Sequence, residues 1–211
     1  NRTQRDRIPI AGGLELTHRC NLACVHCYVN LPANDRGAQQ RELTTEQVYR
    51  VLDQLAEAGV LYLTITGGEP LLRPDFADVY TYAHELGLVI TVYTNGCLVT
   101  DRVIALWQDR PPRDIEITQY GFSPETYDRV ADAGEGQYAR FVRGLTKLRE
   151  AGIAISMKTV AMRSNQDEVV LMQRAAEEAG LGFRFEAIIS PRIDGGQGPL
   201  RGGRRATAAD R

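Results

Sequence analysis

Three cysteines lie close together near the start of the chain, at Cys20, Cys24 and Cys27, and Tyr28 follows the last of them. Their C-x3-C-x2-C spacing allows three thiolates to converge on one metal cluster. Clusters ligated by cysteine normally take four thiolates. A cubane 4Fe-4S cluster has four iron corners, so three thiolates leave one iron open to an outside ligand. The spacing therefore indicates chemistry at an open iron rather than electron storage alone.

A zinc site and a disulfide framework are the alternatives for these cysteines. Structural zinc takes four N or S ligands, and His18 or His26 could complete such a set. Four cysteines in 211 residues are sparse for a disulfide scaffold. The first residues also lack the pattern of a signal peptide. The fourth cysteine, Cys97, lies far along the chain, and we expect it to be a buried thiol.

A second motif, Gly67-Gly68-Glu69-Pro70, follows the cysteines in the chain. Together the two motifs resemble those of the radical S-adenosylmethionine (SAM) superfamily, whose cluster loop has the same spacing with an aromatic residue after the third cysteine. The resemblance covers about residues 13–193. It implies a 4Fe-4S cluster on the three cysteines and SAM chelated at the open iron. Reductive cleavage of SAM would then give a 5′-deoxyadenosyl radical that abstracts hydrogen from a substrate.

The resemblance also implies which other residues form the site. Those expected to bind the cofactors are Tyr28, Gly67, Gly68, Glu69, Pro70, Asn95, Thr118 and Lys158. Glycine at both positions would let the main chain approach the methionine ammonium group, with the charge of the glutamate beside it. Glu186 is expected as a substrate-side base. Tyr120 is the second catalytic candidate, at a position where many relatives have Asp.

Several segments between residues 114 and 186 resemble the SPASM-type subgroup, which includes peptide maturases. We therefore expect a ribosomally made peptide as substrate, modified by a crosslink or an altered residue. A small-molecule substrate of cofactor biosynthesis is the alternative within the superfamily. A non-catalytic iron–sulfur or zinc-binding module is the alternative of another class. The chain has no cysteine after Cys97, so the residues present cannot build the auxiliary clusters of that subgroup.

Composition narrows the remaining function classes. The chain is 43% hydrophobic and 25% charged, which is ordinary for a globular domain. A net charge of -2 gives no overall field that would attract nucleic acid. No apolar run approaches the roughly 20 residues that span a membrane. We expect a cytoplasmic protein that takes electrons from an external donor of the flavodoxin or ferredoxin type.

Alternating strands and helices must position these residues, and the pattern predicts a parallel α/β fold. The expected strands are 13–17, 61–66, 88–94, 114–120, 153–161 and 182–188. The expected helices are 44–58, 74–86, 101–108, 124–131, 138–151 and 167–179. Six repeats are too few for a closed eightfold barrel, and they fit the partial (βα)6 TIM-like barrel of radical SAM cores. We divide the chain into an extension (1–12), the core (13–193) and a linker (194–211) leading to a further region.

Side-chain alternation along the last three strands predicts a polar barrel interior. Ile115, Ile117, Ile153, Ile155, Met157, Phe183 and Phe185 would face outward, and Glu116, Thr118, Tyr120, Ser156, Lys158, Arg184 and Glu186 would face inward. A buried lysine needs a partner because an unpaired charge is costly inside a protein. Lys158 could therefore form an ion pair with Glu116 or Glu186, as an alternative to contacting the SAM carboxylate.

Overall fold

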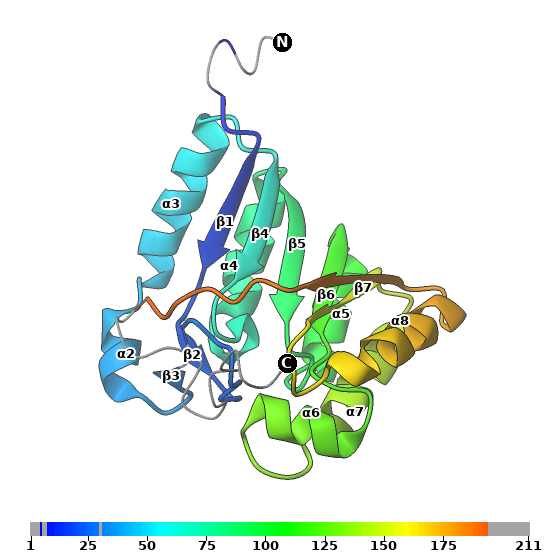
Figure 1. The fold of residues 1–211 in the computed structure, drawn as a ribbon. Coiled ribbons are helices and arrows are strands. Elements are labelled where there is room, and N and C mark those ends of the chain that lie inside the picture. Colours follow the sequence, from blue (N-terminus) through cyan, green and yellow to red (C-terminus); the bar gives the residue numbers. More distant parts are fainter. Residues whose placement is uncertain (1–4, 6–7, 30, 194–211) are drawn as a thin grey trace.

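The computed structural model describes residues 5, 8–29 and 31–193 (Figure 1). Its main feature is a six-stranded parallel sheet in the order β1-β4-β5-β6-β7-β8. The strands are β1 (Ala11–Glu15), β4 (Tyr62–Thr66), β5 (Val89–Thr94), β6 (Asp114–Thr118), β7 (Ile155–Val160) and β8 (Gly182–Glu186). In this order β1 and β8 form the two edges, so the curved sheet in Figure 1 remains open. This confirms the predicted partial barrel.

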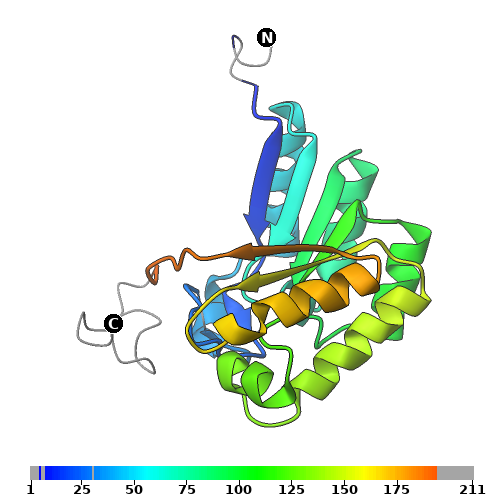
Figure 2. The same cartoon turned by 45° about the vertical axis from the view of Figure 1, so that its right-hand side comes forward.

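Helices cover the outer face of the curved sheet, as Figure 2 shows. They are α3 (Thr45–Glu57), α4 (Phe76–Glu85), α5 (Asp101–Asp109), α6 (Pro124–Ala131), α7 (Gln137–Glu150) and α8 (Val169–Glu178), with short 3-10 turns η1 (Pro70–Leu72) and η2 (Gln166–Glu168). The predicted capping box is present, because Thr44 accepts from the main chain of Gln47 and the Gln47 side chain accepts from that of Thr44.

The hydrophobic core lies between the sheet and these helices. Ile115, Ile117 and Met157 are buried in it, as the alternation predicted. Phe183 packs against the same core, but Phe185 is 56% exposed. The difference arises because β8 is the edge strand of the sheet, where fewer neighbours cover the outer face.

Three short elements were not predicted. β2 (Arg19–Cys20) pairs with β3 (Leu31–Pro32), and α2 (Arg36–Arg41) follows them. Pairings of two residues depend on how loops pack, so hydrophobic periodicity carries no signal for them. The first strand also begins at Ala11, two residues before the predicted 13, and ends at Glu15.

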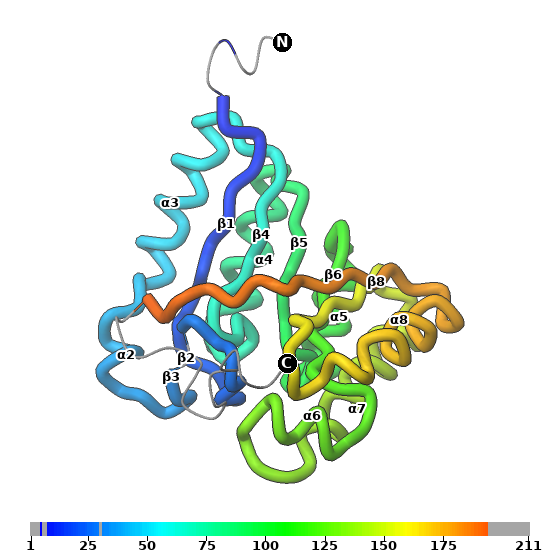
Figure 3. Tube along the Cα trace, in the orientation of Figure 1, coloured from blue at the N-terminus to red at the C-terminus, as the bar shows by residue number. Residues whose placement is uncertain are grey.

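The chain beyond the barrel follows β8 across the open side of the sheet. The tube in Figure 3 shows this segment in orange, running from β8 toward the α2 end of the molecule. Its main-chain N–H at Ile193 donates to the carbonyl of Tyr28 at 3.1 Å. The predicted linker at 194–211 lies outside the described residues. No helix in the described part of the chain is long and apolar enough to cross a membrane.

Candidate active site

A cavity of about 370 Å³ lies at the carboxyl ends of the strands. All three motif cysteines line it, together with residues from the ends of β4 to β8. The predicted site residues that line it are Tyr28, Gly67, Gly68, Asn95, Thr118, Tyr120, Lys158 and Glu186. Segments separated by more than a hundred residues therefore meet at one place. In barrels of parallel strands, this end is where chemistry is carried out.

Main-chain hydrogen bonds hold the cysteine loop in place. The N–H groups of Ala23 and Val25 donate to the carbonyls of Ala131 and Val130, at 2.9 and 3.1 Å, at the end of α6. A further bond from Cys27 to the carbonyl of Cys24, at 3.0 Å, closes a turn within the loop. The loop is therefore fixed at both its centre and its end.

The cysteines form an electrostatically coupled set of thiols without disulfides. Burial, together with the nearby Glu69 and Cys27, raises the pKa of Cys20 to about 12. Burial also raises the pKa of Cys24 well above its usual range, with Cys20 and Cys27 adding to the effect. Cys20 and Cys24 therefore resist ionisation on their own and need a cation to hold them as thiolates, because metal binding deprotonates thiols.

The donor set fits an iron–sulfur cluster. In the described residues, no three His, Cys, Asp or Glu side chains are arranged to hold a single metal ion. A cubane does not require this, because each thiolate binds a different iron atom. Donors also point at the sulfur of Cys20: the Leu22 N–H at 3.4 Å and the Asn95 amide at 3.7 Å. Hydrogen bonds to sulfur are a usual feature of such sites.

Gly67 and Gly68 serve a purpose that the sequence did not indicate. Gly67 has a φ of +134°, and a Cβ there would lie 2.3 Å from the Thr17 carbonyl oxygen. A Cβ on Gly68 would lie 2.2 Å from the carbonyl oxygen of Arg19. The side chains are absent because the main chain that leads into Cys20 packs directly on this turn. Both glycines still line the cavity on their other side.

Glu69 lies beneath the cavity rather than in it. Neither Glu69 nor Pro70 is among the described residues that line the cavity. The Glu69 carboxylate is fully buried and accepts hydrogen bonds from the Thr94 hydroxyl at 2.9 Å and the Asn95 N–H at 2.9 Å. Burial raises its pKa to about 7, although these hydrogen bonds oppose the shift. The carboxylate thus ties the turn to the end of β5.

The inward face of β5 to β8 carries a network of charges. Glu116 accepts from Lys158 at 2.9 Å and from both Nε and Nη2 of Arg184 at 2.7 Å. Arg184 also pairs with Glu186, and the Lys158 ammonium lies 3.7 Å from the centre of the Tyr93 ring. The predicted ion pair between Lys158 and Glu116 is therefore present. Burial lowers the pKa of Lys158, and Glu116 partly offsets this.

Two residues of the cavity were missed as site residues. The sequence offered His26 only as a possible zinc ligand, but it lines the cavity, is only partly exposed and has its ring 5.9 Å from that of Tyr120. Burial lowers the His26 pKa to about 4, with a contribution from Lys158. Tyr93 could have been found by applying strand alternation to β5 as well as to β6, β7 and β8.

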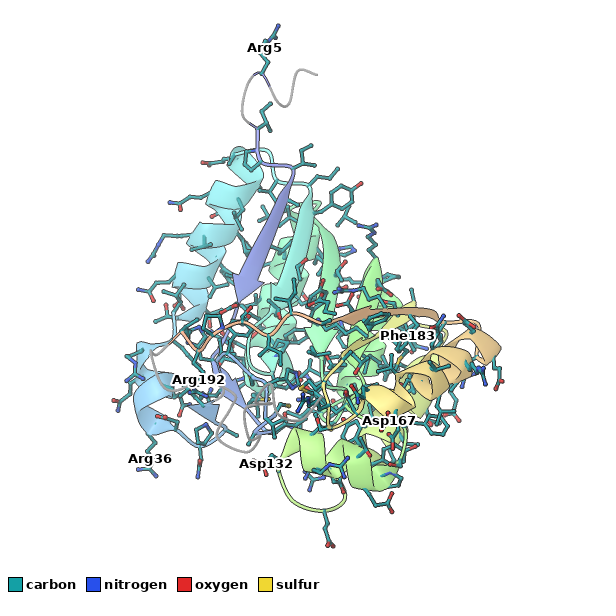
Figure 4. All side chains as sticks on the ribbon, in the orientation of Figure 1. Arg5, Arg36, Asp132, Asp167, Phe183 and Arg192 are labelled. Atoms are coloured by element: carbon teal, nitrogen blue, oxygen red, sulfur yellow. The ribbon has the colours of Figure 1, made fainter. Side chains whose placement is uncertain are left out.

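The segment after β8 also borders the cavity, and only structure could place it there. Ile188, Ile189 and Ser190 line the cavity, and the side chain of Ile188 is largely exposed. Figure 4 labels Phe183 on β8 and Arg192 near the far end of this segment. The open edge of the barrel is therefore bordered by apolar side chains.

Comparison with known proteins identifies the family. Residues 14–175 match the family model described as the radical SAM superfamily. The chain belongs to this superfamily, whose members use a 4Fe-4S cluster and SAM. The resemblance drawn from the two motifs is thereby confirmed.

Three similar curated proteins differ in the functions that their names give. The mycofactocin maturase MftC of Mycobacterium ulcerans is 35% identical over 183 residues, which cover 85% of this chain and 47% of MftC. An AdoMet-dependent heme synthase of Methanosarcina barkeri is 31% identical, covering 79% of this chain and 46% of the synthase. A PqqA peptide cyclase of Ruegeria pomeroyi is 33% identical, covering 82% and 45%. The chain spans about half the length of these relatives.

Solved structures of SuiB from Streptococcus suis share the fold. SuiB bound to S-adenosylmethionine aligns with a TM-score of 0.76 at 17% identity, covering 93% of this chain and 45% of SuiB. SuiB bound to its precursor peptide SuiA aligns with a TM-score of 0.72 at 18% identity, covering 87% and 41%. This likeness confirms the radical SAM type of partial barrel.

Proposed function

We propose that this chain carries the catalytic core of a radical SAM enzyme that modifies a ribosomally made peptide. The observation that carries the proposal is that the thiols of Cys20, Cys24 and Cys27 line one cavity with the Gly67-Gly68 turn. The three sulfurs would hold a 4Fe-4S cluster. Bound together, the cluster and SAM supply a carbon-centred radical that takes a hydrogen atom from the substrate.

The chain's own residues would bind and orient these groups. Gly67, Gly68, Thr118 and Tyr28 all line the cavity together with the thiols. Asn95 is held by its bond to Asn21 at 2.9 Å, so it would fix the cysteine loop more than it would contact SAM. Glu69 would act from below, by holding the turn in place.

The charged network would receive the polar end of SAM and border the substrate. Lys158 lines the cavity, is only partly exposed and is already paired with Glu116, so its charge is not left unpaired. An ammonium group has three donors, so Lys158 keeps donors available for a carboxylate while it is paired with Glu116. Glu186, paired with Arg184 at the exposed end of β8, would be the base on the substrate side.

A peptide substrate is supported by the relatives and by the open edge. One of the three curated relatives is named a peptide cyclase and another a maturase, and one solved SuiB structure contains a precursor peptide. The cavity borders the open side of the barrel, where Ile188 and Ile189 are exposed. An extended chain could enter there and place one residue beside the site while the rest stays outside. The electrons would come from an external flavodoxin or ferredoxin.

A small-molecule substrate is the second candidate, because the AdoMet-dependent heme synthase is almost as similar to this chain. Both candidates share the same radical chemistry and differ in what enters the cavity. The third possibility is a non-catalytic metal-binding module, which differs from both because it would not cleave SAM.

Hydrogen transfer from a labelled substrate tests the proposal. The protein is first loaded with iron and sulfide under anaerobic conditions. It is then given SAM, dithionite and either a fully deuterated precursor peptide (SuiA or PqqA) or a deuterated porphyrin. Deuterium in the recovered 5′-deoxyadenosine from the peptide alone supports peptide modification. Deuterium from the porphyrin alone supports the small-molecule candidate. A protein that binds iron and sulfide but never cleaves SAM is a binding module.

A further inference from the structure

Tyr120 lines the cavity and is held by contacts to its main chain and to its ring. It follows β6, and its carbonyl accepts a hydrogen bond from the Asn165 amide at 3.1 Å. Its ring meets the ring of Tyr127 edge-on with 5.3 Å between centroids. Only 8% of the residue is exposed. The position of the phenol is therefore set by the fold rather than by a ligand.

Tyr120 and Cys24 line the same cavity, and the phenol hydroxyl of Tyr120 is hydrogen-bonded to the Cys24 side chain. Cys24 is itself 7% exposed, so water has little access to its sulfur. A thiolate that binds metal carries no proton and can only accept. In the cluster-bound protein, Tyr120 must therefore be the donor of this bond.

We propose that Tyr120 sets the reduction potential of the cluster by donating a hydrogen bond to the Cys24 sulfur. This inference rests on the proposed function, because it requires a cluster on Cys20, Cys24 and Cys27. Reduction adds one electron from an external one-electron donor, and no proton moves. The added negative charge is shared by the sulfurs, so a fixed donor stabilises the reduced form more than the oxidised form. Tyr120 thus acts through Cys24 as a positioning residue and does not touch the substrate.

A second buried phenol provides a matched comparison within the same cluster of rings. The Tyr127 hydroxyl lies 3.8 Å from the Cys97 sulfur. Tyr127 is fully buried, as Tyr120 nearly is, and the two rings pack on each other. Cys97 is outside the C-x3-C-x2-C motif. Loss of the Tyr127 hydroxyl therefore removes a similar buried hydrogen bond to sulfur without affecting a motif thiolate.

The test is a redox titration of the full chain after anaerobic loading with iron and sulfide. The signal of the reduced cluster in electron paramagnetic resonance is followed in the wild type, Tyr120→Phe and Tyr127→Phe. Tyr120→Phe keeps the ring and removes the donor, so its midpoint potential should shift to a more negative value. Tyr127→Phe should leave the potential unchanged. Equal shifts in both variants, or a wild-type potential in Tyr120→Phe, overturn the inference.

A second substitution covers the case in which Tyr120→Phe takes up no cluster. Fluorotyrosine placed at position 120 keeps the ring and the hydroxyl but makes the phenol a stronger donor. The inference expects a more positive potential than in the wild type, and an unchanged potential contradicts it. If the wild-type protein binds a cluster but the changes at position 120 leave its midpoint potential unchanged, the role of Tyr120 is overturned and the proposed function is not affected. A wild-type protein that binds no cluster overturns both this inference and the proposed function.

Discussion

The main-chain N–H of Gly68 donates to the carbonyl of Thr17 at 2.7 Å, and this bond joins the two sequence motifs. The next N–H, of Glu69, donates to the Arg19 carbonyl at 2.9 Å. The turn after β4 therefore holds in place the main chain that enters the cysteine loop. The two motifs form one structural unit, although Gly67 lies forty positions after Cys27 in the chain.

Gly68→Ala should lower both stability and cluster retention. The added methyl group would overlap the Arg19 carbonyl, which is main chain and cannot rotate away. We expect a loss of about 1–3 kcal/mol in the free energy of unfolding, typical of overpacking. Gly13→Ala is the control, since a Cβ there meets nothing within 4 Å. Thermal unfolding and iron content measure the effect. Equal behaviour of the two variants would contradict the role of the turn in holding the main chain that enters the cysteine loop.

Cys24→Ala should abolish cluster binding and SAM cleavage together. Removing one of three thiolates leaves two ligands on a site that already has an open iron. Cys97→Ala should keep both properties, because Cys97 is not among the described residues that line the cavity. Iron and sulfide analysis with visible absorbance decides between the outcomes. A Cys24→Ala protein that retains its cluster would overturn the assignment of Cys24 as a cluster ligand.

Lys158→Ala should weaken SAM binding about tenfold, which corresponds to about 1.4 kcal/mol, with iron content unchanged. The loss arises because the cavity would no longer present an ammonium group to the SAM carboxylate. Lys147, the chain's other lysine, pairs with Asp101 on the surface and serves as the control. Equilibrium dialysis with labelled SAM measures both variants. Unchanged affinity in Lys158→Ala would reduce its role to pairing with Glu116.

Glu168 should make stability depend on pH in the acid range. It accepts bonds from the N–H of Phe122 at 2.6 Å and from the hydroxyls of Ser123 and Thr126 at 2.7 and 2.8 Å. Burial raises its pKa, but these hydrogen bonds outweigh the effect and the net pKa is lowered. Because the pKa of Glu168 is lower in the folded state, its carboxylate contributes its full stabilisation at pH values above the unfolded-state pKa of about 4.3. That stabilisation is lost as pH falls through the folded-state pKa.

Glu168→Gln should therefore lower the free energy of unfolding at pH 7 by about 1 kcal/mol, a modest value because the group is partly exposed. The difference from the wild type should shrink as the solution is acidified. Glu178→Gln, at an exposed position near the end of α8, should show neither effect. Denaturant unfolding at several pH values measures this. A difference that is constant down to acid pH would rule out the carboxylate charge as its cause.

Much of the fold could be predicted because its signals are local. The alternation of apolar residues identified the six strands, and the Thr44 capping box marked the start of α3. The same alternation placed Lys158 and Glu116 on one inward face, where they form the predicted ion pair. The cysteine motif was found because its spacing is specific in itself.

The parts that were missed depend on contacts between distant segments. The reason for two glycines after β4 lies in the main chain of Thr17 and Arg19, which no local pattern reveals. The position of Glu69 also depends on a distant segment, because its carboxylate accepts a hydrogen bond at the end of β5. His26 reaches the cavity only because the loop folds back over the strand ends.

The most direct test of the account is whether the three cysteines support reductive cleavage of SAM. The full chain is loaded anaerobically with iron and sulfide, SAM and dithionite are added, and 5′-deoxyadenosine is measured by mass spectrometry. The account predicts 5′-deoxyadenosine from the wild type and from Cys97→Ala, and none from Cys24→Ala. A loaded wild-type protein that produces none, or a Cys24→Ala protein that produces as much as the wild type, would contradict it.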